Sequence, residues 1–298
     1  MRGIVKNTFI PARGEWKLAY DFFCPTKIGS NPPLVLLHGL LGNRKQNRHV
    51  AKILAHNLQT PVLIPDLTNH GDSFHRSAHS NKLMSDDISS LLKSPEINPQ
   101  YSGGYVMIGH SMGGKAAMLH ALNHPNDVLG VASVDNVPYR NPSAADPEFA
   151  RFDRFFSYAK QYLTNSTFSS LTEVDQKLKE IEQDKLFRQL LVSNFRRSKV
   201  SKSMECKVPV EVLQRSLEGL KVLEVDNSVK YYGPLLIIRA LKSPFVGVID
   251  HEKVSCHFPN YSISDINTGH WVITEDCPGF VTIIDEWIKN QNFGNHQQ

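Results

Sequence analysis

The pentapeptide Gly-His-Ser-Met-Gly at residues 109–113 joins an apolar run to a stretch with helical periodicity. The run at 105–108 has the length of a buried strand, and apolar residues at 116–122 recur on one helix face. Glycines on both sides of Ser111 allow the sharp turn and the close packing of strand against helix that this junction needs. An ordinary glycine-rich turn is the alternative. The flanking strand and helix favour a turn that projects a nucleophilic Ser111 hydroxyl above the sheet edge.

Short apolar runs alternate with stretches of helical periodicity along most of the chain. Strand-length runs precede and follow the serine motif, and amphipathic stretches such as residues 50–58 separate them. This alternation predicts the α/β class, with a mostly parallel, twisted sheet that is covered by helices on both faces. Pro278 opens the last predicted helix. The other predicted strands are at residues 34–37, 62–64, 131–134, 235–238 and 263–266.

The alternation stops after residue 138 and resumes near residue 231. Residues 139–230 contain helical stretches but no convincing buried strand. We therefore predict a single domain over 1–298, with a core of 1–138 and 231–298 and a helical cap or lid at 139–230. An insertion between core strands usually covers a site. Three phenylalanines of the insertion could line an apolar pocket, although such a stripe is more often core packing. They are Phe152, Phe155 and Phe156.

Composition excludes several classes of protein. Of the 298 residues, 41% are hydrophobic and 21% are charged, so a packed core is possible and wholesale disorder is not. The net charge of +4 is too small to indicate nucleic-acid binding without a clustered basic patch. No apolar run approaches the ~18 residues that a membrane-spanning helix needs.

The cysteines are few and widely separated. Cys24, Cys206, Cys256 and Cys277 form no Cys-x-x-Cys pair, which argues against a zinc site and a redox pair. They are also too scattered for a disulfide framework, which favours a reducing compartment. We expect no metal and no bound cofactor, and nothing in the sequence indicates a nucleic-acid, membrane-spanning or protein partner.

A serine nucleophile needs a base and an acid that orients the base. His270 follows the last predicted strand, where a loop can reach back over the sheet, although a loop histidine packed on Trp271 is the alternative. Two acids compete for the third role. Asp135 ends the strand after the serine, whereas Asp250 follows a longer loop at a helix start, where N-capping is its ordinary role. An orienting acid must be held rigidly, which favours Asp135.

Acyl transfer also needs two backbone N–H groups that stabilise the oxyanion. The N–H of Met112, directly after the candidate nucleophile, is the first candidate. The second is the N–H of Leu40, in the Gly-rich loop at residues 38–42 after the first parallel strand. The side chain of Leu40 is expected to line the pocket.

These motifs resemble the α/β-hydrolase superfamily over residues 34–288. The first ~30 residues are expected to add strands to the sheet. Residues 66–73 resemble a family loop with a mainly structural role, so His70 and Asp72 are not assigned to catalysis. An acid at Asp135 narrows the resemblance to the branch of the mitochondrial α/β-hydrolase domain-containing protein 11 and the yeast ethanol acetyltransferases. The segments most similar to the yeast acetyltransferases are 38–48, 69–73 and 109–115.

This resemblance implies a serine-dependent enzyme that makes ethyl acetate from acetyl-CoA and ethanol through an acetyl intermediate on Ser111. Esterase and thioesterase side activities are implied as well. A plain ester or thioester hydrolase uses the same residues and is the alternative, and a non-catalytic receptor or scaffold on this fold is a more distant one. Acetyl-CoA, or another acyl donor, is then a substrate rather than a cofactor, and a small alcohol or water is the acceptor.

Basic residues are relevant to binding of the acyl donor and to the cellular compartment of the protein. The clusters at 44–48 and 196–202 could contact the phosphates of CoA, although solvated helix faces are the ordinary interpretation. Residues 1–14 contain three basic residues and no acidic residue, which is a faint transit-peptide character. The family resemblance implies a mitochondrial location, and a cytoplasmic location is the alternative.

Overall fold

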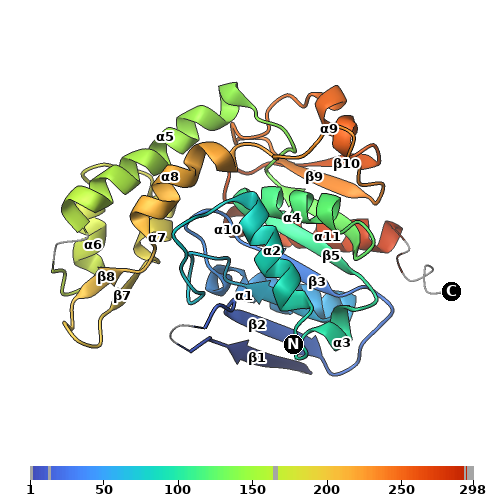
Figure 1. Ribbon diagram of the computed structural model, residues 1–298, viewed down its shortest axis with the longest axis horizontal. Helices are drawn as coiled ribbons and strands as arrows, with labels where there is room; N and C mark the ends of the chain where they lie inside the picture. Colours follow the sequence, from blue (N-terminus) through green and yellow to red (C-terminus); the bar gives the residue numbers. More distant parts are fainter. Residues whose placement is uncertain (1–2, 13–14, 164–166, 292, 294–298) are drawn as a thin grey trace.

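The computed structural model describes residues 3–12, 15–163, 167–291 and 293. An eight-stranded sheet forms its centre, with helices on both sides (Figure 1). The strands are β1 (Ile4–Phe9), β2 (Tyr20–Pro25), β3 (Leu34–Leu37), β4 (Val62–Pro65), β5 (Tyr105–His110), β6 (Val128–Val134), β9 (Leu235–Ala240) and β10 (Tyr261–Ile266). The helices of the core are α1 (Arg44–Leu58), α2 (Asn81–Leu92), α3 (Asn98–Tyr101), α4 (Met112–Asn123), α9 (His251–His257), α10 (Val272–Glu275) and α11 (Cys277–Asn290).

The strand order confirms the class predicted from the sequence. In space the strands follow the order β1-β2-β4-β3-β5-β6-β9-β10. β1 pairs antiparallel with β2, and β2 pairs antiparallel with β4. All neighbours from β4 to β10 are parallel, so their carboxyl ends meet at one edge of the sheet. The expected extra strands in the N-terminal segment are β1 and β2.

Side chains of the parallel strands alternate between two apolar cores. In β3, Leu34 and Leu36 belong to one core, and Val35 and Leu37 belong to the other. Helices α1 and α11 pack on the Leu34 side, and α2 and α4 pack on the opposite side. Because both faces are covered, the central strands β3 and β4 are apolar throughout, which explains why short unbroken runs mark them in the sequence, whereas the edge strand β10 contains polar residues.

The helical insertion lies between β6 and β9. It comprises α5 (Pro142–Tyr158), the π-helical turn η1 (Ala159–Leu163), α6 (Leu171–Leu178), α7 (Lys185–Val192), β7 (Phe195–Arg197), β8 (Met204–Cys206) and α8 (Val210–Leu220). Figure 1 shows it in light green to gold, extending to one side of the sheet, with α5 and α8 packed side by side. The predicted helices are present. The antiparallel pair of β7 and β8 was not predicted, because strands of three residues are too short to show a periodicity.

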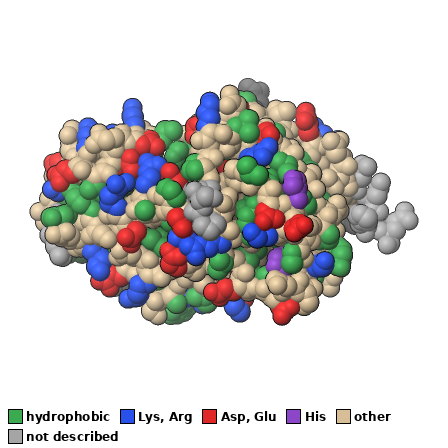
Figure 2. All heavy atoms as spheres, turned by 90° about the horizontal axis from the view of Figure 1, so that it is seen from above, with side chains coloured by type: hydrophobic (Ala, Val, Ile, Leu, Met, Phe, Trp, Pro, Cys, Tyr) green, Lys and Arg blue, Asp and Glu red, His purple; other side chains and the backbone are tan. Residues whose placement is uncertain are grey.

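Within the described part of the chain, no helix is long and apolar enough to cross a bilayer. On the face in Figure 2, acidic and basic side chains are interspersed rather than separated into regions of one sign.

The faint transit-peptide character of the N-terminal segment rests partly on residues without a described structure. Lys6 lies in β1, whereas Arg2 and Arg13 are outside the described residues.

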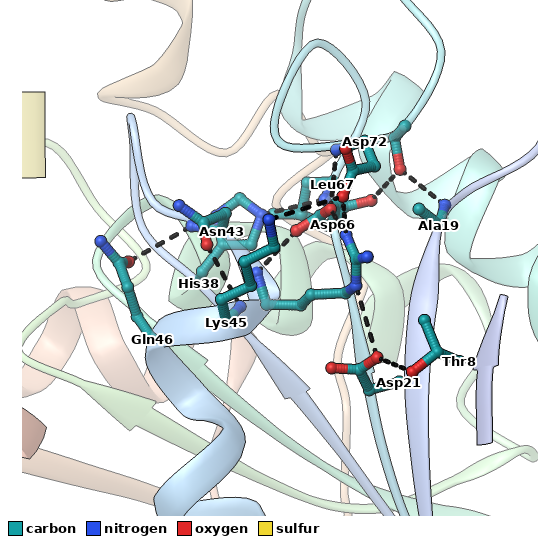
Figure 3. A network of polar contacts seen from close by, with 12 residues as sticks. Thr8, Ala19, Asp21, His38, Asn43, Lys45, Gln46, Asp66, Leu67 and Asp72 are labelled. Carbon is teal, nitrogen blue, oxygen red and sulfur yellow. Dashed lines mark hydrogen bonds and ion pairs between the residues drawn. The ribbon is translucent and has the colours of Figure 1, made fainter. Parts of the chain in front are cut away.

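A buried cluster of ion pairs joins the start of α1 to three other parts of the fold (Figure 3). Arg44, only 1% exposed, pairs through Nη1 with Asp66, directly after β4, and with Asp72 at 2.8 Å. The Arg44 backbone N–H donates to Asp66 Oδ1 at 2.6 Å, and its Nε lies 3.6 Å from Asp21 Oδ1 in β2. From the insertion, Arg196 of β7 pairs with Asp72. One buried guanidinium therefore connects β2, β4, α1 and, through Asp72, the insertion.

This burial corrects the interpretation of the basic cluster at residues 44–48. Arg44 lies neither on a solvated helix face nor in a position to bind a phosphate, since aspartates surround it. Burial raises the pKa of Asp66, and the neighbouring Arg44 opposes that rise. The charge of Arg44 is thus used to keep a buried carboxylate in place.

We expect Arg44→Met to lower the free energy of unfolding by about 3–5 kcal/mol, because it leaves Asp66 buried without its partner. Urea unfolding followed by circular dichroism measures the loss. Arg48→Met is the matched control, because the Arg48 side chain is 35% exposed and its partner Asp21 keeps Lys6 and Arg44 nearby. The control should lose no more than about 1 kcal/mol. Equal losses of unfolding free energy in the two variants would contradict the conclusion that Arg44 contributes more to stability than Arg48.

Candidate active site

Ser111 lies between β5 and α4 in a backbone conformation that side chains rarely adopt. Its φ is 53° and its ψ is −116°, so its hydroxyl stands on a strained turn. A Cβ added to Gly109 would lie 2.2 Å from the carbonyl oxygen of Gly113, and one added to Gly113 would lie 2.6 Å from that of His38. Both glycines are therefore required for the close approach of strand, turn and helix. The strand–turn–helix context that singled out Ser111 in the sequence is present.

The structure brings His270 and Asp135 together. His270 Nδ1 lies 2.7 Å from Asp135 Oδ2, although the two residues are 135 positions apart. Asp135 is fully buried directly after β6, and its φ of 52° turns the chain so that the carboxylate faces His270. The hydroxyl of Ser243 donates to the same Oδ2, and the N–H of Ala240 donates to Oδ1 at 3.4 Å. The carboxylate is thus held by three groups from β9 and the loops after β9 and β10.

Asp250, the competing acid, lies elsewhere. It is the N-cap of α9, where its Oδ1 accepts the Lys253 N–H at 3.1 Å. Its side chain is 39% exposed and forms a surface ion pair with the same lysine. The helix-capping position expected as its ordinary role is therefore the one it occupies.

Several residues that the sequence did not reveal fix the loop that carries His270. The carboxylate of Glu275, in α10, accepts the N–H groups of Gly269 at 2.8 Å and Trp271 at 3.3 Å, the two neighbours of His270. The ring of Phe245 stacks on the imidazole with centroids 3.9 Å apart. Glu275 therefore fixes the loop that carries His270, and the apolar ring of Phe245 packs against the imidazole itself.

His110, the neighbour of Ser111, also supports this loop. Its Nε2–H donates to the His270 carbonyl at 2.7 Å, and the two rings lie 4.6 Å apart. Burial lowers the pKa of His110 to about 3, so the ring is neutral at physiological pH. Position within the serine motif is the one sequence signal that could have identified it.

The Nε2 atom of His270 remains available. It is buried and has no hydrogen-bond partner among the described residues, so no bond to the Ser111 hydroxyl is present. Catalytic hydrogen bonds are often long in structures without substrate and shorten when substrate binds. The arrangement therefore offers an oriented imidazole with a free nitrogen, on a loop that His110 ties to the strained serine turn.

The loop before α1 forms a tight turn that two distant residues hold. The Gly42 N–H donates to the Gly39 carbonyl at 3.0 Å, and Leu41 in this turn has a φ of 60°. The Leu41 N–H donates to His70 Nε2 at 3.1 Å, and the Leu41 carbonyl accepts from Asn194 Nδ2 at 2.8 Å. A left-handed backbone conformation costs a leucine about 1–2 kcal/mol, so these hydrogen bonds are what keep Leu41 in this conformation.

The two N–H groups expected to form an oxyanion hole are free of other partners. No hydrogen bond between the described residues uses the N–H of Leu40 or of Met112. Leu40 lies in the turn just described, and Met112 is the first residue of α4. Helix N-termini leave such donors unpaired, which suits a developing negative charge. His70 contributes by holding Leu41, which agrees with a structural role for residues 66–73.

A cavity of about 310 Å³ opens beside this turn. A Cβ added to Gly39, in the cavity wall, would lie 3.4 Å from Ser111 Cβ, so this wall residue packs against the serine turn, although Ser111 itself does not line the cavity. Its walls come from the turn, the start of α1, the insertion helix α7 and the loop after His270. The lining residues are His38, Gly39, Leu40, Gly42, Gln46, Asn47, His110, Leu186, Gln189, Leu190, Ser193, Trp271, Val272, Ile273 and Thr274.

The phenylalanines proposed as pocket lining are core residues instead. Phe152, Phe155 and Phe156 are all buried in the core of the insertion, and none of them lines this cavity. Phe152 packs edge-to-face on Phe187 of α7, with centroids 5.1 Å apart. Phe152 therefore packs against α7, and other residues of α7 line the cavity.

A family model described as "alpha/beta hydrolase fold" matches residues 32–276, and the chain belongs to this family. The solved structure named "Marine microorganism esterase" has the same fold, with a TM-score of 0.81 at 22% identity, covering 91% of this chain and 99% of that one.

Similar curated proteins narrow the comparison. The Schizosaccharomyces pombe "Abhydrolase domain-containing protein C22H12.03" is 30% identical, covering 92% of this chain and 98% of its own. A Saccharomyces cerevisiae "Probable alcohol acetyltransferase" is 30% identical over 82% of this chain and 73% of its own. The Xenopus laevis "sn-1-specific diacylglycerol lipase ABHD11" is 29% identical over 92% and 84%. The resemblance to this branch is confirmed, and it supports an acyl-transfer or hydrolytic enzyme.

If Asp135 orients His270, Asp135→Asn should lower turnover of a chromogenic acetate ester by up to about 10⁴-fold, because the amide stabilises the wrong imidazole tautomer. Asp250→Asn is the matched control. It should cost about 1 kcal/mol of stability or less and leave the rate nearly unchanged. Initial rates and thermal melts of both variants check this, and an inactive Asp250→Asn beside an active Asp135→Asn would reverse the assignment.

Proposed function

We propose that the protein is a serine-dependent alcohol O-acetyltransferase, which makes ethyl acetate from acetyl-CoA and ethanol and also hydrolyses esters and thioesters. The observation that carries the proposal is the buried pair of Asp135 and His270, with a free Nε2, on a loop tied to the strained Ser111 turn through His110. The curated relatives named as alcohol or ethanol acetyltransferases support transfer to an alcohol.

In the first half of the proposed reaction, Ser111 Oγ attacks the acetyl carbonyl and gives its proton to His270 Nε2. Asp135 stabilises the imidazolium that forms, and the N–H groups of Leu40 and Met112 bind the oxyanion. The tetrahedral intermediate then breaks its carbon–sulfur bond. CoA leaves as the thiol after taking the proton from His270, and an acetyl-serine remains.

In the second half, the acceptor replaces the thiol. His270 Nε2 takes the proton of the alcohol hydroxyl as its oxygen attacks the acetyl-serine, and returns that proton to Ser111 as the ester leaves. Water in place of the alcohol gives acetate. The buried position of Ser111 favours transfer, because shielding the acyl-enzyme from water is what lets a dilute alcohol compete.

Hydrolysis as the main activity is the second candidate. The same residues serve both reactions, and one relative is named as a diacylglycerol lipase. The identity of the acceptor in the second half distinguishes the two, so the decisive measurement is the product formed from acetyl-CoA with and without ethanol. A non-catalytic receptor would form neither product and would not react with a serine-directed phosphonate.

We expect Ser111→Ala to lower formation of ethyl acetate and of acetate together, each by at least about 10³-fold, because both pass through the acetyl-serine. Gas chromatography and an acetate assay measure the products, and labelling by a serine-directed phosphonate should disappear in the same variant. Ser90→Ala, at an exposed helix position, is the control and should behave as wild type. Retention of either product by Ser111→Ala would refute the shared intermediate.

The wall supplied by α7 should govern the choice between alcohol and water. Leu186 of α7 lines the cavity and is only partly buried, so Leu186→Ala widens the cavity at little cost to folding. We expect a lower ratio of ethyl acetate to acetate, with a smaller change in total acetyl-CoA consumption. Phe155→Ala is the contrasting variant. It should cost about 3–5 kcal/mol of stability and keep the product ratio, because Phe155 is core. An unchanged ratio in Leu186→Ala would place acceptor choice elsewhere.

A further inference from the structure

Asn47 has a buried amide that no protein group satisfies. It lies in the second turn of α1, is 6% exposed, and lines the cavity beside the turn at residues 39–42, which carries the Leu40 N–H and is called the oxyanion turn below. Its Nδ2 is buried without a partner, and its side chain makes no hydrogen bond to any described residue. Buried polar groups are almost always hydrogen-bonded, and because Asn47 lines the cavity, its partner can be a bound molecule or a water in the cavity.

The neighbouring amides on α1 are already used. Asn43 Oδ1 accepts the Lys45 N–H at 3.1 Å, and Gln46 Oε1 accepts the Asn43 N–H at 3.2 Å, which together cap the helix. Asn47 follows Asn43 by four positions and takes no part in this cap. Helix capping therefore explains the polar residues before Asn47 and leaves Asn47 itself without a structural role.

We propose that Asn47 binds an amide group in the leaving-group arm of a thioester donor. This inference rests on the proposed function. The acetyl group has a single polar atom, its carbonyl oxygen, which the N–H groups of Leu40 and Met112 receive. The hydroxyl of ethanol is consumed as the attacking group. The remaining polar part of the reactants is the arm of the thiol, which in CoA carries amides beyond a two-carbon spacer.

The chemistry and the size of the cavity fit such an arm. A side-chain amide offers a donor and an acceptor, so it can donate to the carbonyl or accept from the N–H of a secondary amide. The cavity volume of about 310 Å³ is at the lower end of small-molecule sites, enough for a slender arm. Because Leu40 and Asn47 line the same cavity, one bound molecule can reach both the oxyanion turn and the amide.

Two acetyl thioesters that differ only in the arm test this proposal. S-(2-acetamidoethyl) thioacetate carries the amide, and S-pentyl thioacetate replaces it with methylenes. For Asn47→Leu we expect kcat/KM to fall about 5- to 30-fold on the first donor, mainly through KM, and to stay within about twofold on the second. The ratio of the two effects isolates the contact between amide and Asn47. The melting temperature should not fall, because the substitution removes an unpaired buried amide.

Asn57→Leu is the matched control. Asn57 carries the same amide near the end of the same helix but is exposed and does not line the cavity, so the rates on both donors should be unaffected. Equal losses of Asn47→Leu on both donors would overturn the proposal and make Asn47 a support of the oxyanion turn. Unchanged rates on both would overturn it in favour of a bound water.

A second variant and a third substrate separate the possible failures. If Asn47→Leu folds poorly, Asn47→Ser must show the same donor-dependent loss, and an equal loss on both donors overturns the proposal. Hydrolysis of p-nitrophenyl acetate by wild type but not by Ser111→Ala supports the serine machinery whatever happens at Asn47. If wild type hydrolyses that ester but neither thioester, the proposed thioester donor fails, and this inference fails with it.

Discussion

The pairing of Arg44 with Asp66 is the constraint on which the arrangement of the site depends. Both groups are buried, and separating them would leave a charge without compensation. Arg44 directly follows the oxyanion turn, and Asp66 begins the loop that contains His70, so one ion pair fixes two loops. These loops meet again where the Leu41 N–H donates to His70 Nε2. The free N–H of Leu40 is therefore positioned by the core of the protein.

The insertion is attached to the same two loops. Arg196 pairs with Asp72, which Arg44 also contacts, and Asn194 donates to the Leu41 carbonyl from the segment just after α7. The helix that forms the outer wall of the cavity is thus tied directly to the residue that shapes the oxyanion turn. In the proposed mechanism, a change that displaces α7 therefore acts on donor binding and on oxyanion stabilisation together, and only the partly buried positions of the wall can be altered independently.

Local patterns in the sequence predicted most of the fold and part of the site. Periodicity and flanking glycines located the strands and the Ser111 turn, and the need for a rigid acid favoured Asp135, which the structure places beside His270. Two supports of His270, His110 and Phe245, cannot be predicted from the sequence because they reach it from distant segments. Glu275 is close in the chain, but its sequence surroundings are those of any carboxylate in a short helix. The sequence pattern places Arg44 in a basic cluster, because the sequence shows the charge of a residue but does not show whether its side chain is buried.

Three buried histidines near Ser111 are held in their neutral form. Burial lowers the pKa of His38 to about 4 and those of His70 and His110 to about 3, so all three stay neutral above about pH 5. Each donates one ring N–H to a carbonyl, and His38 and His70 also accept a backbone N–H. The two accepted bonds require the neutral rings of His38 and His70. The loops around Ser111 therefore keep one hydrogen-bonding pattern across the physiological range, which leaves His270 as the proton carrier in the proposed mechanism.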